Sequence, residues 1–426
     1  MKGPPARPGH GHHPSHSDGH GDQAGTPSTL RGGRALTAIV GLLVGLTVLG
    51  LVLLRPDHAG PPPGAPESGE RVRGTVTAVA QIDCAADQLP GSASAAGSAG
   101  PPAPGAAVCV EVQVRLDEGS DAGVLVSQVS GDNATARSEV GDGVVLIRSP
   151  GQVPLAERYQ LSDVQRGRPL AVLAALFAFA VVALGRWKGL RALAGLGISL
   201  VVLVTWLVPA LLAGRPPILT AIVGAGAVML VVLLLAHGPN VRTATAIVGT
   251  AASLLLTLGL ASAFVQAASL SGVTSDEATY VQVLFGGLDL RGLLLAGIVI
   301  GALGILDDVT VTQVSTVYEL RAANPVMPSR ELYGAGLRVG RDHVASLVNT
   351  LLLAYAGASL PLVVIFTTSG EGLIGSLTNG VLAQEVVRTL VGSIGLVAAV
   401  PLTTALAAVM CPPVRAPDEV APGNLT

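Results

Sequence analysis

Long apolar runs separated by short polar segments fill most of the chain. The runs lie at 35–54, 170–185, 191–213, 218–236, 243–267, 291–315, 343–366 and 387–410. Most of them come near the length of about 20 residues with which a helix crosses the hydrocarbon core of a bilayer. The pattern therefore predicts an all-α integral membrane bundle of about eight transmembrane helices.

The segment from Pro56 to Arg168 differs, because it is polar and its apolar residues recur at every second position. In Val108–Leu116, Val and Leu alternate with Cys, Glu, Gln and Arg, as in a half-buried strand. Further strands are predicted at 72–79, 124–129 and 144–147, between Gly and Asp turns. We expect a small β-barrel or sandwich inserted after the first helix, with a flexible Gly, Ala, Ser and Pro insert at 89–107.

These boundaries divide the chain into five predicted parts. They are a disordered His/Pro/Gly-rich cytoplasmic tail at 1–33, a transmembrane anchor at 34–55, an extracytoplasmic β domain at 56–168, a seven-helix transmembrane core at 169–411 and a cytoplasmic tail at 412–426. The first tail has too few apolar residues to bury the surface that folding requires. A cleaved signal peptide competes with the anchor, but the first run and its polar lead are both longer than a signal normally has.

The composition supports a membrane protein. Of 426 residues, 50% are hydrophobic and 12% are charged, and the mean hydropathy is +0.61. Soluble domains carry about a quarter charged residues, so the expected partner is the lipid bilayer. The net charge of -3 and the lack of a basic patch interleaved with aromatic residues exclude nucleic acid as a partner.

The distribution of basic residues predicts the orientation. Arg31 and Arg34 precede the first run, which places the N-terminus in the cytoplasm. An even number of spans then puts both termini inside and residues 56–168 outside the plasma membrane. The basic residues on the predicted inner side are Arg186, Lys188, Arg191, Arg242, Arg321, Arg330, Arg338, Arg341 and Arg415, and those outside are Arg215, Arg291 and Arg388.

Two cysteines, Cys84 and Cys109, flank the insert of the β domain. We expect them to form a disulfide, because such bonds persist outside the cytoplasm. Two unpaired thiols remain the alternative, since no spacing rule forces this pair.

The N-terminal tail carries five histidines, His10, His12, His13, His16 and His20. Neutral imidazoles at these spacings could gather around a divalent metal ion. A solvated low-complexity tail is the simpler interpretation, because no cysteine or carboxylate pattern fixes a coordination geometry.

Two adjacent carboxylates, Asp307 and Asp308, lie inside an apolar run that has no turn signal. Charged side chains are costly in a lipid-facing helix, so they usually face protein or water. Residues at steps of three and four form one stripe, which contains Gly297, Gly301, Gly304, Asp308, Thr312, Ser315 and Glu319. We expect this stripe to be a buried face, because small residues let helices approach and polar residues bond across the contact. Packing alone and a substrate or ion path both remain open.

The pair lies about 23 Å along its helix, at about 1.5 Å per residue, which is towards the cytoplasmic leaflet. A residue of the next run, Asn349, reaches the same level. The predicted polar core consists of Asp307, Asp308, Thr312, Gln313, Ser315 and Asn349, with Arg341, Asp342 and His343 at its cytoplasmic mouth. Two neighbouring carboxylates repel when both are ionised, so one should hold a proton unless a cation or Arg compensates. This chemistry suits proton or cation coupling.

Enzymatic readings of the pair are weaker. Adjacent aspartates point about 100° apart on a helix, so they cannot face each other across a substrate as in an aspartyl protease. The chain also lacks DDxxD, GxxxxGK[ST] and HExxH motifs. We therefore expect neither enzymatic activity nor a cofactor. An intramembrane enzyme would need a second catalytic group from another span.

The stretch GALGILDDVTVTQVSTVYEL, followed by ELYGAGLRVGRDHVASLVNTLLLAYAGASLPL, resembles the signature region of the YibE/F-like family of multi-spanning membrane proteins. LSDVQRGRPL and RWKGLRAL resemble this family too, so the resemblance covers about Leu161 to Pro401. The His-rich tail and the insert lie outside it. The resemblance implies a multi-spanning membrane protein, described at most as a permease, and defines no mechanism.

Together these observations favour a secondary permease whose path passes the acidic pair and Asn349. Its partner would be an unidentified small solute or ion. The alternative is a structural or sensory membrane protein whose β domain binds an envelope partner. The sequence leaves open the substrate, the coupling ion and whether the chain forms a homo-oligomer.

Overall fold

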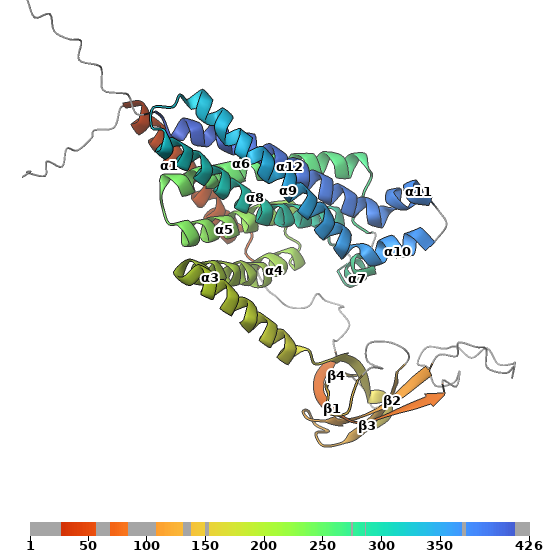
Figure 1. Ribbon diagram of the computed structural model, residues 1–426. Helices are drawn as coiled ribbons and strands as arrows, with labels where there is room; N and C mark the ends of the chain where they lie inside the picture. The colour runs from red at the N-terminus through yellow and green to blue at the C-terminus, as the bar shows by residue number, and fades with distance from the viewer. Residues whose placement is uncertain are drawn as a thin grey trace, which may run out of the picture.

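The computed structural model describes residues 27–56, 69–83, 108–130, 138–149, 153–273, 276–285, 287–368 and 372–413. These residues form a helical bundle and a small antiparallel sheet that lies beside it (Figure 1). The helices are α1 (Pro27–Leu53), α2 (Leu155–Arg158), α3 (Gly167–Val202), α4 (Val208–Leu212), α5 (Pro217–His237), α6 (Val241–Ala267), α7 (Asp276–Leu284), α8 (Leu290–Ala323), α9 (Ser329–Ala358), α10 (Leu360–Thr368), α11 (Gly372–Thr378) and α12 (Gly380–Met410). A π-helical turn, η2 (Leu203–Leu207), joins α3 to α4.

Within these ranges, 6 segments are long and apolar enough to cross a membrane. They are Gly33–Leu53, Gly167–Leu212, Pro217–His237, Val241–Ala267, Leu290–Ala323 and Gly380–Met410. The predicted runs at 35–54, 218–236, 243–267, 291–315 and 387–410 match five of them. The apolar pattern therefore located these helices, although α8 continues beyond its predicted end and α12 begins before its predicted start.

The predicted runs at 170–185 and 191–213 belong to one long element that turns back on itself. At Arg186, α3 adopts φ 50° and ψ -127°, a left-handed conformation that side chains rarely take. A Cβ atom on Gly189 would meet the carbonyl oxygen of Val181, so the two arms of the resulting hairpin touch beside the turn. The first arm, Gly167 to Gly185, contains no buried residue.

The predicted run at 343–366 belongs to two helices, because α9 ends at Ala358 and α10 begins at Leu360. By length and composition α9 is not one of the six segments. Its first half explains this, since Arg338, Arg341 and Asp342 lie there.

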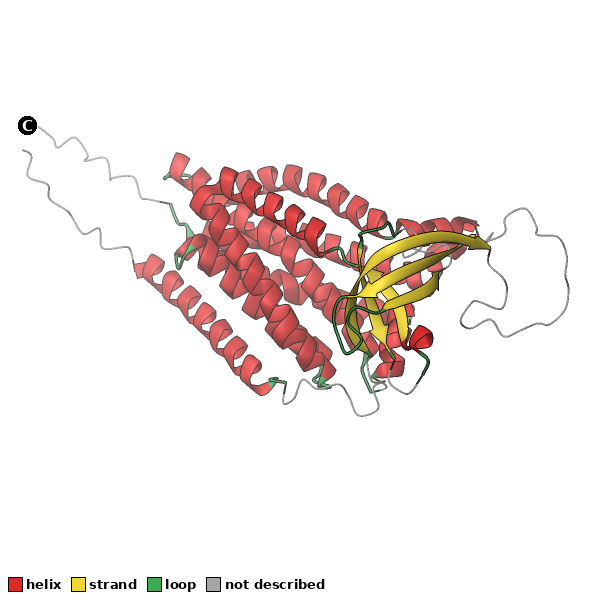
Figure 2. Cartoon of the chain, turned by 90° about the horizontal axis from the view of Figure 1, so that it is seen from below, coloured by secondary structure: helices red, strands yellow, loops and turns green. Residues whose placement is uncertain are grey.

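The bundle is built around α8, which packs against α5, α6, α9 and α12. At one end, here called the terminal end, lie the start of α1, the α5–α6 turn, the α8–α9 turn and the end of α12. At the opposite end, here called the sheet end, Arg215 donates to the carbonyl oxygen of Arg55 at 3.0 Å. Trp206 also donates to the carbonyl oxygen of Leu51, at 3.2 Å. Figures 1 and 2 show that the sheet lies beyond the sheet end.

The sheet contains β1 (Glu70–Asp83), β2 (Val108–Leu116), β3 (Leu125–Ser130), β4 (Gly143–Arg148) and β5 (Tyr159–Val164). Its strand order is β3-β2-β1-β4-β5, and every neighbouring pair is antiparallel. The predicted alternation is confirmed, because Val110, Val112, Val114 and Leu116 are all buried. The predicted strands correspond to β1 to β4, whereas β5 was not predicted.

Several predictions lie outside the described residues. They concern Cys84 and therefore its bond to Cys109, the insert at 89–107, the histidines at 10–20 and the tail at 414–426.

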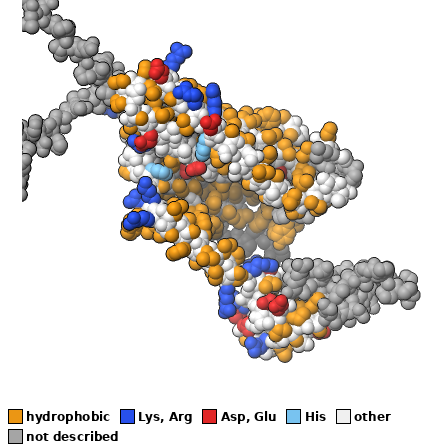
Figure 3. All heavy atoms as spheres, in the orientation of Figure 1, with side chains coloured by type: hydrophobic (Ala, Val, Ile, Leu, Met, Phe, Trp, Pro, Cys, Tyr) orange, Lys and Arg blue, Asp and Glu red, His pale blue; other side chains and the backbone are white. Residues whose placement is uncertain are grey.

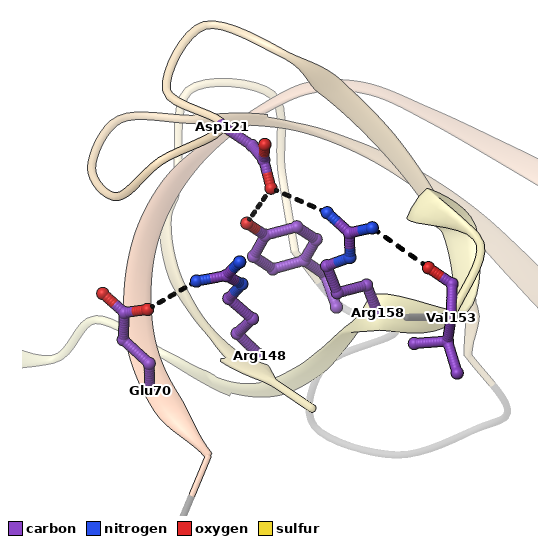
Figure 4. Close-up of polar contacts among 6 residues, drawn as sticks. Glu70, Asp121, Arg148, Val153 and Arg158 are labelled. Atoms are coloured by element: carbon purple, nitrogen blue, oxygen red, sulfur yellow. Dashed lines mark hydrogen bonds and ion pairs between the residues drawn. The ribbon is translucent and has the colours of Figure 1, made fainter. Parts of the chain in front are cut away.

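A polar network fixes one end of the sheet (Figure 4). The hydroxyl of Tyr159, whose side chain is fully buried, donates to Asp121 Oδ2 at 2.7 Å. Arg158 donates to the same oxygen at 3.4 Å and to the carbonyl oxygen of Val153 at 3.2 Å. The network therefore ties the loop between β2 and β3 to the start of β5.

The same contacts change the ionisation of both partners. The hydrogen bond from Tyr159, followed by the charges of Arg158 and Arg148, lowers the pKa of Asp121 from 3.8. Burial and the hydrogen bond to Asp121 raise the pKa of Tyr159 from 10.0. Ionised Asp121 therefore stabilises the sheet at neutral pH.

This network predicts a pH dependence of the sheet. Because the pKa of Asp121 is lower in the folded chain, its contribution is fully present above 3.8 and is lost as the pH falls through the folded value. We expect hydrogen exchange of β4 and β5 in the full-length protein to accelerate below about pH 4, after correction for the intrinsic rate. The Asp121→Asn variant should show a flatter profile over that range. An identical profile in both proteins would contradict this assignment.

Candidate functional site

The small and polar stripe of α8 lies on the surface of the chain. Its exposed members are Gly297, Gly301, Gly304, Asp308, Thr312 and Glu319, and Ser315 is half-buried. A Cβ atom on Gly297 or Gly304 would meet nothing within 4 Å. The prediction that this stripe is a buried face was therefore wrong for the isolated chain. The opposite face of α8 carries the large apolar residues, and their burial against α6 and α12 sets the rotation of the helix.

The exposed face of α8 does not look like a surface for lipid. None of the large apolar side chains of α8, which is described throughout, is exposed. The surrounding helices do expose such side chains, for example Leu42 on α1, Phe179 on α3 and Leu353 on α9. The hydrophobic surface in Figure 3 shows how widely such residues cover the molecule. The stripe is therefore a polar, narrow strip on an otherwise apolar bundle.

The two carboxylates differ in their surroundings. Asp308 is exposed on the stripe, whereas Asp307 is half-buried on its flank, as consecutive positions about 100° apart on a helix require. Asp307 Oδ1 is buried and has no hydrogen-bond partner among the described residues. An acceptor in this position can take a proton, a cation or a ligand donor.

The backbone beside the pair is held firmly. Thr310 donates to the carbonyl oxygen of Asp307 at 3.1 Å, and its hydroxyl lies 2.5 Å from that of Thr250 on α6. Both threonines are fully buried. This contact fixes the height of the acidic pair relative to α6.

Gln313 was predicted to belong to the polar core, but its side chain is buried elsewhere. Its Nε2 atom donates to the carbonyl oxygen of Gly336 at 2.9 Å and to Thr404 Oγ1 at 2.7 Å. The side chain is 3% exposed and points away from the stripe, into the junction of α8, α9 and α12. Gly340 leaves room for it, because a Cβ atom there would lie 2.8 Å from Gln313 Oε1.

The α9 members of the predicted site lie along one side of α8. Contacts of Gln313 with Gly336 and of Gly301 with Tyr355 show that the two helices run antiparallel. This register places His343 near the level of Asp308, and Asn349 near that of Gly304. His343 is half-buried, and its Nε2 atom is buried without a partner among the described residues.

The other predicted site residues lie at the level of Asp308 or nearer one of the two ends of the bundle. Asn349, Arg341 and Asp342 are exposed, and the last two lie towards the terminal end. Ser315 lines a pocket between α5, α6 and α8. Asp307, Asp308 and His343 thus lie at similar levels along the bundle and Asn349 about one turn away, whereas the side chain of Gln313 points into the junction of α8, α9 and α12.

A family model described as YibE/F-like protein matches residues 173–413, more than half of the chain. The chain belongs to the YibE/F-like family. The match includes the acidic pair and all of α5 to α12, and it leaves out α1 and the sheet. Searches of curated proteins and of solved structures find no match.

The sequence did not predict one cluster of polar residues in this YibE/F-like chain. His237, Asn240, Arg242 and Thr243 surround the α5–α6 turn and lie opposite Ser315. The only local signal is Asn240, a residue type that favours the start of a helix. In the parts of the chain that are described, no group of three or more His, Cys, Asp or Glu residues could hold a metal ion.

Proposed function

We propose that this YibE/F-like protein is an eight-span secondary permease of the plasma membrane. Six apolar segments give eight spans in two steps. The segment Gly167–Leu212 forms a hairpin and counts as two spans, and α9 with α10 adds one span that is not among the six. Both termini would then be cytoplasmic and the sheet extracytoplasmic. Figure 3 supports this orientation, since Lys and Arg side chains gather at the terminal end of the bundle.

The stripe of α8 carries the proposal. It is exposed but has no large apolar side chain, so burying it in lipid would gain little. Two carboxylates on or beside it suit contact with water, a cation or a polar solute better than contact with hydrocarbon. The solute or ion would move along this stripe, with Asp307 and Asp308 as the groups that bind a coupling proton or cation.

A block of the stripe tests this proposal without changing the charge. Gly304→Leu adds a side chain where nothing lies within 4 Å, so the fold should tolerate it. We expect proton flux into liposomes under an imposed pH gradient to fall about tenfold, which corresponds to roughly 1.4 kcal/mol in barrier. Gly41→Leu on α1 is the matched control, because this exposed glycine also has nothing within 4 Å.

The two glycine variants decide between a path and an inert surface. The control should retain native flux at equal protein content. Equal flux from the native chain, Gly304→Leu and Gly41→Leu would overturn the proposal, as would native flux no faster than that of protein-free liposomes.

A structural or sensory role of the sheet is the second candidate. One observation favours it: Leu125 on the edge strand β3 is 57% exposed, and edge strands can pair with another chain. Deleting residues 70–166 separates the candidates. A permease core should retain flux after this deletion, whereas a sensor should lose its function entirely.

A further inference from the structure

We propose that the pocket between α5, α6 and α8 at the terminal end binds a phosphate group. This pocket, here called the α5–α6 pocket, has a volume of about 200 Å³. Its polar lining residues are His237, Asn240, Arg242, Thr243 and Ser315. No carboxylate lines it, so its chemistry is that of hydrogen-bond donors and positive charge.

An unpartnered hydroxyl is the main observation. Thr243 is 3% exposed, and its Oγ1 atom has no hydrogen-bond partner among the described residues. Buried polar groups are nearly always paired, so a ligand in the pocket would explain this orphaned atom. The backbone of Thr243 is already satisfied, because its N–H donates to Asn240 Oδ1 at 2.9 Å.

The electrostatics of the pocket favour an anion. The N-terminus of α6, with its partial positive charge, lies at the pocket because Asn240 caps this 27-residue helix. Arg242 in its first turn donates from Nη1 to Glu319 at 2.9 Å and stacks 5.0 Å from the ring centroid of Tyr318. These contacts hold the guanidinium in place. Nε and Nη2 have no partner in the part of the chain that is described, so they are available to a ligand.

A phosphate group suits these donors, since Arg, hydroxyl groups and helix N-termini are its usual partners. It could come from a lipid headgroup at the cytoplasmic boundary or from soluble phosphate. The pocket lies at the end of the proposed spans, where both sources would reach it. This inference does not depend on transport along α8.

Binding is tested on the full-length protein in neutral detergent, by titration calorimetry with inorganic phosphate. The lipid source is tested in phosphatidylcholine nanodiscs that contain a small fraction of phosphatidic acid, by mass spectrometry of the lipid that stays bound. Thr243→Val removes the hydroxyl and nearly keeps the side-chain volume. We expect it to weaken binding about tenfold, the effect of losing a hydrogen bond to a charged ligand.

Thr403→Val is the matched control. Thr403 is also fully buried with an unpartnered Oγ1, but it lies on α12 against Gly249, outside the pocket. It should bind like the native chain. Arg242→Gln, a second pocket variant, should also lose binding.

The two assays identify the source of the phosphate. Phosphate binding without enrichment of phosphatidic acid would support a soluble ligand, and enrichment without phosphate binding would support a headgroup. Absence of both in the native chain would overturn the proposal, and so would equal binding by Thr243→Val and Thr403→Val.

Discussion

Liposomes that contain the Asp307→Asn, Asp308→Asn double variant are expected to take up protons no faster than protein-free liposomes. Asn keeps the size of the side chain and can neither ionise nor neutralise a cation. Asp307 Oδ1, buried and unpartnered, would lose its ability to accept a proton, and the exposed charge of Asp308 would leave the stripe. Under an imposed pH gradient, we expect flux to fall at least about tenfold.

The control for this experiment is Asp342→Asn. Asp342 is an exposed carboxylate on α9, nearer the terminal end, and its replacement removes one negative charge, against two in the double variant. It should change flux by much less than the double variant. If the double variant conducts like the native chain at equal incorporation, the acidic pair has no part in transport.

Replacement of Arg321 by Ala is expected to cause the largest loss of stability. Arg321 is 6% exposed and donates from Nε to the carbonyl oxygen of Cys411 at 2.9 Å. Its Nη1 atom donates to the carbonyl oxygens of Pro325 and Met327 in the α8–α9 turn. One guanidinium thus joins the end of α8, the following turn and the end of α12. Its charge also complements the negative end of the α12 dipole.

We expect Arg321→Ala to lower the free energy of unfolding by about 3 kcal/mol, because it leaves several carbonyl oxygens without their donor. Unfolding of the purified chain by heat in detergent, followed by tryptophan fluorescence, measures the change. Arg330→Ala is the control, since Arg330 is exposed at the same end and makes no hydrogen bond or ion pair among the described residues. Equal melting temperatures for both variants would contradict the role assigned to Arg321.

Apolar patterning predicted the helices well where length and periodicity decide the structure. Helices α5 and α6 match their predicted runs within two residues at each end. The two arms of the α3 hairpin match the predicted runs at 170–185 and 191–213, whereas the tight turn at Arg186 was not predicted, because it needs a positive φ that non-glycine residues seldom take. Strand β5 was missed because YQLSDV leads into α3 after only two residues, without a clear turn signal.

The candidate site shows a different limit. Periodicity correctly placed Gly304, Asp308 and Thr312 on one face of α8, but it could not give the direction of that face. A row of small and polar residues has the same sequence pattern whether it packs against protein or faces water. The α5–α6 pocket could not be predicted from the sequence either, because it forms only where the turn at Asn240 lies against Ser315, a residue far along the chain.

The first arm of α3 connects the sheet to the helical bundle. From Gly167 to Gly185 the arm is about 28 Å long, at roughly 1.5 Å per residue. Since none of its residues is buried, lipid rather than protein would set its tilt in a membrane. A change in tilt of about 10° would displace the attached sheet by about 5 Å over a lever of this length. The thickness of the bilayer around this arm would thus influence the position of the sheet relative to the bundle.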